Sequence, residues 1–175
     1  ALKPVITLRG EGRSEVHYTM DGTLPDATSA RYTGPIVPQA SGVVRAIAVN
    51  GEALPSGVAQ QDFNVYEWMK PVQIKNVLPG LRFSAYEWTP QTTAEIDAQK
   101  AVKEGVAGKV DAEYATRKEN VGLRFDGYFK ATKDALYTFY LNSDDGSRLF
   151  IDGREVINHD GFHGNDEKEG AAALK

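Results

Sequence analysis

The sequence predicts an all-β protein built from two consecutive β-sandwich modules. Three observations carry this prediction. Apolar and polar residues alternate strictly through residues 121–129 and 135–142, as they do in half-buried strands. Short runs of β-branched and aromatic residues recur between clusters of Gly, Pro and Asp. Only residues 92–104 have the composition of a helix, and their apolar stripe is weak.

The first module is predicted to span residues 1–65. Its stretch DGTLPD has the residues of a tight turn, because Asp21 can bond the backbone two residues on, Gly22 tolerates positive φ and Pro25 restricts φ. Regular spacing of short strands around such turns is typical of a small sandwich. The strands that we expect are 5–8, 16–20, 43–49 and 58–65.

Residues 66–77 are predicted to be a packed linker rather than a flexible one. Proline interrupts the segment, yet Tyr66, Trp68, Met69 and Val72 are apolar. Such a composition favours packing between domains over free movement.

The second module is predicted to span residues 78–175. We expect a strand at 81–87 and then a surface helix or ordered loop at 92–104, with Thr92 or Thr93 as its cap and Gly105 after its end. The two alternating segments are joined by KATKDA, a connection suited to a hairpin. Two further short strands, 148–151 and 155–157, flank Asp152-Gly153, which is a strong hairpin signal.

Composition excludes several classes of function. The chain has 175 residues, a net charge of −4 and no basic stripe, so nucleic acid is not an expected partner. No apolar run is long enough to cross a bilayer, so no membrane partner is expected either. The absence of cysteine excludes disulfides, thiolate zinc sites and cysteine nucleophiles.

The second half of the sequence resembles the protective-antigen-type (PA14) domain, a β-sandwich of bacterial glycosidases, toxins and yeast adhesins. The segments that carry the resemblance are PGLRFSAYE, FDGYFKATKDALYTFYLNSDDGSRLFIDGREVI and NHDG, within residues 79–161. The family pattern continues with a glycine turn and further core strands after EKEGAAALK. The resemblance therefore implies a PA14-type sandwich that is incomplete at its C-terminal end.

The first 65 residues resemble the small immunoglobulin- or fibronectin-like domain that follows the catalytic barrel of chitobiases and β-hexosaminidases. The segments YTMDGTLPD, RYTGPI and VVRAIAVNGEALPSGVAQQDF carry this resemblance. The two modules in this order look like the C-terminal part of a family-20 glycoside hydrolase, a β-N-acetylhexosaminidase. That likeness implies a bacterial protein that is secreted, periplasmic or on the cell surface, with its export signal and its catalytic domain upstream of this fragment.

The paired carboxylates of Asp144 and Asp145, in the sequence SDDG, are the candidate functional site. In yeast adhesins that the domain resembles, such a pair binds calcium, and the calcium holds sugar hydroxyls. Calcium prefers six to eight oxygen ligands, so the chemistry fits. Adjacent side chains on a regular strand point to opposite faces, so an irregular backbone, such as a cis peptide, is required for both to reach one ion. Further candidate ligands are Asn158, Asp160, Asn165 and Asp166.

Two interpretations of this site remain open. In the first, the second module is an accessory domain that recognises glycan with the help of Ca²⁺, and Tyr86, Trp88 and Phe162 are candidates to stack on sugar rings. In the second, SDDG is a capped turn, and both modules serve only as a scaffold or as a protein-interaction surface.

Two other chemistries are not expected. His159 and His163 have a spacing that suits zinc on a helix, but glycines at 161 and 164 favour a solvated loop. Glycoside hydrolysis needs two carboxylates on opposite sides of the sugar, and adjacent aspartates cannot provide them. We therefore expect this fragment to have no catalytic residues, although its parent protein is expected to be a glycosidase.

Overall fold

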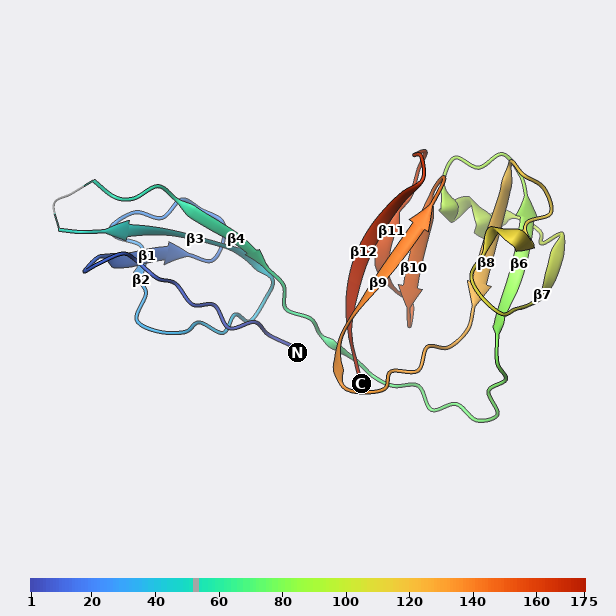
Figure 1. The fold of residues 1–175 in the computed structure, drawn as a ribbon, viewed down its shortest axis with the longest axis horizontal. Helices are drawn as coiled ribbons and strands as arrows, with labels where there is room; N and C mark the ends of the chain where they lie inside the picture. Colours follow the sequence, from blue (N-terminus) through green and yellow to red (C-terminus); the bar gives the residue numbers. More distant parts are fainter. Residues whose placement is uncertain (52–53) are drawn as a thin grey trace. The chain divides into compact units, whose positions relative to one another are not determined.

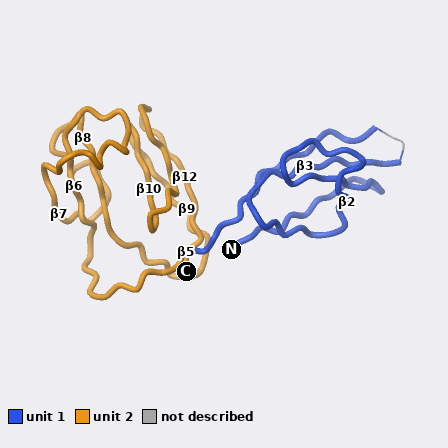
Figure 2. The backbone as a smooth tube through the Cα atoms, turned by 180° about the vertical axis from the view of Figure 1, so that it is seen from behind, with its two compact units in different colours: residues 1–68 blue, residues 69–175 orange. Residues whose placement is uncertain are grey.

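The structure is a computed structural model that describes residues 1–51 and 54–175. The described chain is almost entirely β, which confirms the predicted fold class (Figure 1). It divides into two compact units, residues 1–68 and residues 69–175 (Figure 2). Glu52 and Ala53, in the connection between two predicted strands of the first module, lie outside the described residues.

The first unit is built on one antiparallel sheet with the strand order β2-β1-β3-β4. Its buried apolar side chains include Val16, Val44, Ile47 and Phe63. Three of the four predicted strands are confirmed to within a few residues. The strands are β1 (Glu15–Thr19), β2 (Ala30–Arg31), β3 (Gly42–Val49) and β4 (Ala59–Phe63).

The strand predicted at residues 5–8 is wrong, because only Ile6 forms a bridge, with Ile36. The two residues exchange backbone hydrogen bonds of 2.9 and 3.0 Å. An extended antiparallel ladder would next pair Pro4 with Pro38. Neither proline has an N–H to donate, so the pairing cannot extend in that direction.

The predicted turn after β1 is confirmed. The carboxylate of Asp21 accepts hydrogen bonds from the backbone N–H of Thr23 at 3.0 Å and from its hydroxyl at 2.6 Å. Gly22 has a φ of +78°, the left-handed conformation that glycine adopts at no steric cost. Asp26 makes the same pair of bonds with Thr28, so two similar turns follow one another.

The second unit contains two groups of strands, which lie apart in Figure 1. In one group, the sheets have the orders β5-β12-β9 and β10-β11, and in the other the order is β7-β6-β8. The elements are β5 (Trp68–Met69), β6 (Leu81–Glu87), η1 (Thr93–Ala98), β7 (Lys103–Ala107), η2 (Ala112–Tyr114), β8 (Val121–Asp126), β9 (Ala135–Ser143), β10 (Ser147–Ile151), β11 (Arg154–His159) and β12 (Asp166–Leu174).

The segment predicted as a helix or ordered loop, 92–104, is helical only in the 3₁₀ element η1. Thr92 lies at the N-cap position but its side chain makes no capping hydrogen bond. The end of the segment belongs instead to β7, which pairs with β6. Gly105 does not end a helix. It lies under the Phe83 ring, and an added Cβ there would come within 2.7 Å of a ring carbon. Long-range strand pairing outweighs local helix propensity here.

The predicted hairpin between residues 121–129 and 135–142 is also wrong. Both strands form, but β8 pairs with β6 whereas β9 pairs with β12. The connection between them is held by the Tyr137 hydroxyl, which accepts hydrogen bonds from the backbone N–H groups of Thr132 and Lys133 at 2.9 and 3.2 Å. These N–H groups are therefore not available to a hairpin ladder. Phe129 lies beyond the end of β8 and packs edge-on against Tyr137 and Phe139.

The hairpin at Asp152-Gly153 is confirmed, and it joins β10 to β11. Both residues have positive φ, 47° and 76°, as a two-residue type I′ turn requires. Sequence analysis assigned no strand to residues 166–174, yet β12 pairs with β9 along its whole length. This register places Asp166 opposite Ser143, so the loop after β9 and the loop before β12 lie at the same end of the sheet.

Candidate functional site

The SDDG loop joins the end of β9 to the start of β10. The hydroxyl oxygens of Ser143 and Ser147 lie 2.6 Å apart and close the loop at its base. Asp144 and Asp145 are both exposed at its tip. The peptide bond between them is cis, which is the irregular backbone named in the sequence analysis.

The loop between β11 and β12 lies against the SDDG loop. The backbone N–H of His163 donates to Oδ1 of Asp145 at 3.3 Å. Gly146 has no room for a side chain, because an added Cβ would lie 2.8 Å from Oδ1 of Asp160 and 2.9 Å from the nitrogen of Gly161. The structure therefore brings the aspartate pair next to the segment that supplies the other candidate ligands.

Asp160 connects this pair of loops to η1. Its Oδ1 accepts the backbone N–H of Thr93 at 2.8 Å and that of Gly161 at 3.0 Å. Burial acts to raise the pKa of Asp160, but the hydrogen bonds from Thr93 and Gly161 stabilise the carboxylate and bring its pKa below the usual value. One of its oxygens is thus already committed to the fold.

The other three candidate ligands differ in the contacts that their side chains already make within the fold. Asn158 lies in β11, where its amide nitrogen donates to Glu155 at 2.9 Å and its Oδ1 accepts the backbone N–H of Asp160 at 3.3 Å. Asp166, at the start of β12, has Oδ2 3.7 Å from Nε2 of His159 and remains exposed. Asn165 is exposed in the loop before β12.

His159 and His163 are not the solvated loop residues that the sequence suggested. Their rings stack with centroids 3.8 Å apart, and only 15% of the His159 side chain is exposed. The His163 ring nitrogens face the carbonyl oxygens of Gly164 at 2.9 Å and His159 at 3.1 Å, and these two carbonyls raise the pKa of His163. Both nitrogens of His163 are occupied, so it is not a zinc ligand here. No sequence signal pointed to this stack, because it depends on where β11 ends.

The three candidate aromatic residues have different environments. Trp88 donates its indole N–H to Glu95 in η1 at 3.1 Å, and its ring covers Gly122, where an added Cβ would meet ring carbons at 2.4 Å. Tyr86 is half-buried in β6 opposite Gly122. Phe162 has 68% of its surface exposed and lies in the loop that contacts Asp145. Phe162 is therefore the aromatic side chain best placed to meet a ligand at the SDDG loop.

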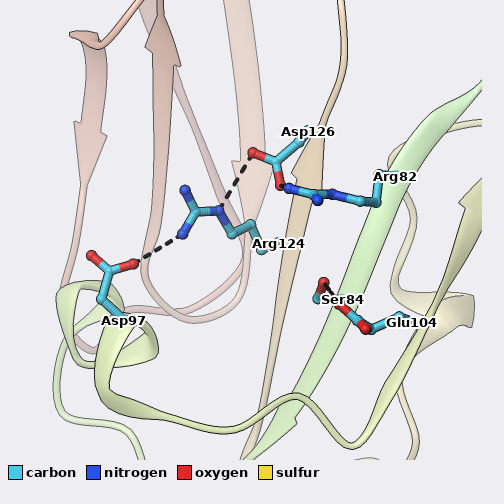
Figure 3. Close-up of polar contacts among 6 residues, drawn as sticks. All are labelled: Arg82, Ser84, Asp97, Glu104, Arg124 and Asp126. Atoms are coloured by element: carbon cyan, nitrogen blue, oxygen red, sulfur yellow. Dashed lines mark hydrogen bonds and ion pairs between the residues drawn. The ribbon is translucent and has the colours of Figure 1, made fainter.

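A second polar cluster lies on the β7-β6-β8 sheet (Figure 3). Arg124 bonds Asp97 of η1 at 2.9 Å and contacts Asp126 at 3.5 Å, and Arg82 contacts the other oxygen of Asp126 at 3.3 Å. Nearby, Ser84 donates to Glu104 at 3.1 Å. The attraction of Asp126, with that of Asp97, raises the pKa of Arg124. Two arginines face two aspartates, so the cluster compensates its own charge and ties η1 to β8.

The donor atoms at the SDDG loop fit a hard cation. Asp145 has one carboxylate oxygen bonded to His163, and the carboxylate of Asp144 has no hydrogen-bond partner in residues 1–51 and 54–175. Three carboxylate oxygens are thus free to bind Ca²⁺. No three His, Asp or Glu side chains converge as a metal site anywhere in the described ranges. A calcium ion at this loop would therefore depend on carbonyl, water or ligand oxygens for the rest of its shell.

Each of the two units matches a known domain family. Residues 79–174 match the PA14 domain, a match that covers more than half of the chain. The chain belongs to the PA14 domain family. Residues 6–63 match the domain described as Fn3 associated, so the PA14 domain here follows a fibronectin-like accessory module. No curated protein and no solved structure matches the chain.

The PA14 match covers every residue of the SDDG loop, the β11–β12 loop and η1. PA14 domains are a known type of carbohydrate-binding accessory domain, and neither they nor Fn3-associated domains are catalytic themselves. No helix in the described part of the chain is long and apolar enough to span a membrane.

Proposed function

We propose that this chain is a non-catalytic accessory region of a secreted bacterial glycoside hydrolase, and that its PA14 unit binds glycan through a calcium ion held by Asp144 and Asp145. The observation that carries the proposal is the exposure of both carboxylates on a loop whose shape is maintained by neighbours. The Ser143–Ser147 contact closes that loop, and His163 supports Asp145 from the adjacent loop. Exposed carboxylates held in place by neighbouring groups are what a calcium-dependent lectin site needs.

The ligand set follows from which oxygen atoms are free. Asp144 and the unbonded oxygen of Asp145 supply the charge. Asn165 and Asp166 are exposed, and the register places Asp166 opposite Ser143, next to the aspartate pair. Two sugar hydroxyls complete the coordination shell together with water. Phe162, exposed in the same loop, packs on the apolar face of the sugar. The first unit is the spacer toward the upstream catalytic domain, which we expect to be a family-20 β-N-acetylhexosaminidase.

The first experiment is a thermal melt of the chain in EDTA, in millimolar Ca²⁺ and in millimolar Mg²⁺. A ligand at about one hundred times its Kd adds about 2.7 kcal/mol to stability. For a unit of this size we expect a rise in Tm of about 4–10 °C with Ca²⁺ and a smaller one with Mg²⁺. A second arm measures binding of N-acetylglucosamine oligomers to the calcium-loaded and the EDTA-treated protein.

The variant Asp144→Asn removes one charge from the site without removing any hydrogen bond of the fold, and it should abolish the calcium shift. Asp134→Asn is the matched control, since Asp134 is exposed in the same unit, outside the SDDG loop. An identical Tm in EDTA and Ca²⁺, from a chain that melts cooperatively, would contradict the calcium site and favour a purely structural scaffold. A calcium shift without oligosaccharide binding would refute only the choice of sugar.

A further inference from the structure

The first unit contains an open cavity that the proposed function does not use. Its volume is about 360 Å³, within the range of small-molecule sites. It lies along β1 and the end of β3, next to the loop that contains the second aspartate turn. Its lining residues are Arg13, Glu15, His17, Ala27, Val49 and Gly51.

Arg13 brings a positive charge to this cavity. It follows Gly12, whose φ of +60° belongs to a tight turn closed by a hydrogen bond from Ser14 to Glu11. In the described part of the chain, no carboxylate pairs with Arg13 and no carbonyl accepts its N–H groups. A free guanidinium presents a planar fork of donors that matches a carboxylate.

Glu15 and His17 bring two polar groups, each fixed by a neighbour. One oxygen of Glu15 is bound by Arg31 at 2.9 Å, which offsets its charge. Nδ1 of His17 lies 2.9 Å from the carbonyl oxygen of Ser29, so Nδ1 carries the hydrogen and donates it. The His17 side chain is only 11% exposed, and its other nitrogen, Nε2, lies 3.8 Å from the second oxygen of Glu15.

At 3.8 Å these two atoms are too far apart to hydrogen-bond to each other, so both can bond to a ligand. The carboxylate oxygen of Glu15 accepts a hydrogen, and a ring nitrogen of imidazole either accepts or donates one. A hydroxyl group from outside the protein can therefore bond to both. A hydroxyl group is better suited than an ammonium group, because Arg31 already balances the charge of Glu15.

We propose that this cavity is a second saccharide site, specific for a sugar that carries a carboxylate, such as a hexuronate. The carboxylate binds the guanidinium of Arg13, and neighbouring hydroxyls donate to Glu15 and hydrogen-bond with Nε2 of His17. Val49 and Ala27 supply the apolar part of the wall. The site lies in the Fn3-associated unit and is independent of calcium at the SDDG loop.

The test is a titration of the ¹⁵N-labelled full chain with D-glucuronate, D-glucose, acetate and glycine, each in EDTA. D-glucuronate should give saturable shifts of the Arg13, His17 and Gly51 amides. D-glucose lacks the carboxylate, acetate lacks hydroxyls, and glycine offers an ammonium in place of hydroxyls. Each of these three should bind about tenfold or more weakly, the loss expected from one missing charge-assisted hydrogen-bond pair.

Two variants and one spectroscopic signature complete the test. Arg13→Gln should weaken D-glucuronate binding by about tenfold or more, whereas Arg9→Gln, at an exposed arginine of the same unit outside the cavity lining, should not. Long-range ¹H–¹⁵N spectra should show the Nε2 resonance of His17 shifting on D-glucuronate binding.

Several results would overturn the proposal. They are equal binding of D-glucuronate by Arg13→Gln and the natural chain, acetate or glycine binding as tightly as D-glucuronate, and no saturable shift at all. Shifts confined to the SDDG loop would likewise refute this site. Because every arm is run in EDTA and read out on the first unit, failure here leaves the calcium proposal untouched.

Discussion

The carboxylate of Asp160 accepts the backbone N–H of Thr93 at 2.8 Å, and this hydrogen bond joins the β11–β12 loop to the start of η1. The same oxygen atom lies where a side chain at Gly146 would have to be. One side chain therefore positions three segments that are far apart in the sequence, and the SDDG loop is one of them.

Replacing Asp160 should loosen all three segments. Asp160→Ala removes a charged acceptor from two backbone N–H groups, so we expect a loss of about 1–3 kcal/mol in the free energy of unfolding. Asp160→Asn keeps an acceptor oxygen and should lose less. Urea denaturation in EDTA, followed by tryptophan fluorescence, measures the difference. Asp134→Ala is the control, and an Asp160→Ala variant no less stable than that control would contradict the role of this carboxylate.

Substitutions at Trp88 and Phe162 should distinguish an aromatic residue that stabilises the fold from one that binds a ligand. Trp88→Ala loses the bond to Glu95 and uncovers Gly122, so we expect it to cost about 2–4 kcal/mol. Phe162→Ala, at a side chain that is 68% exposed, should change stability by less than about 0.5 kcal/mol. It should nevertheless weaken oligosaccharide binding in calcium. Stability is measured by urea denaturation and affinity by calorimetry, and unchanged affinity in Phe162→Ala would remove it from the site.

The charge cluster around Arg124 should contribute little, and its contribution should depend on salt. The Arg124 side chain is 49% exposed and that of Asp97 is 75% exposed. We expect Arg124→Met to cost about 0.5–1 kcal/mol at low ionic strength. The cost should shrink in about 1 M NaCl, where charges are screened within about 3 Å. Lys118→Met, at an exposed site, is the control, and a large loss that is insensitive to salt would indicate a packing role for Arg124 instead.

Acidification should destabilise the first unit through its aspartate turns. The hydroxyl and backbone N–H of Thr28, with help from Ser29, hold the pKa of Asp26 below its usual value. A carboxyl with a lowered folded-state pKa stabilises fully above its unfolded pKa of about 3.9, and this stability is lost as pH falls through the lower folded value. Asp26→Asn should therefore flatten the pH dependence of stability below about pH 4.

The check on Asp26 is a series of urea titrations at acid pH, followed by the amide cross-peaks of β3. Asp62→Asn is the control, because Asp62 is an exposed carboxylate in β4 outside these turns. If both variants lose stability on acidification in parallel with the natural chain, the turn hydrogen bonds do not account for the acid sensitivity.

Gly170 should be intolerant of any side chain. It lies in β12 where β11 crosses closely, and an added Cβ would lie 2.2 Å from the carbonyl oxygen of Val156 and 2.6 Å from a side-chain carbon of Ile157. Gly170→Ala forces these strands apart, at an expected cost of about 1–3 kcal/mol. Gly164→Ala is the control, since nothing lies within 4 Å of its added Cβ. Equal thermal stability of the two variants would contradict the close approach of β11 and β12.

Features that depend on neighbouring residues were predictable. The turn at Asp21 forms because its carboxylate reaches Thr23 two residues on. The β10–β11 hairpin forms because Asp152 and Gly153 both accept positive φ. The alternation of 135–142 correctly places Tyr137 and Phe139 toward the core side of β9 and leaves Tyr140 exposed.

Features that depend on strand partners were not predictable. Residues 103 and 104 lie in the segment predicted as a helix, yet they belong to β7 and pair with β6, where Gly105 accommodates the Phe83 ring. The connection KATKDA suits a hairpin, yet β8 and β9 pair with other strands. Residues 5–8 have strand composition, but the prolines at 4 and 38 stop the ladder on one side of the single Ile6–Ile36 bridge.

The sequence by itself determined the all-β class, most strand positions, the turns at Asp21 and Asp152 and the identity of the paired carboxylates at 144 and 145. Only the tertiary structure decided that these carboxylates lie beside the loop at 160–165, that the two histidines stack, and that Arg13, Glu15 and His17 share a cavity. The physical reason is that turns and alternation are set by interactions within a few residues, whereas these sites depend on sheet register. A single pairing, Ser143 opposite Asp166, brings the two loops together, and no local pattern encodes it.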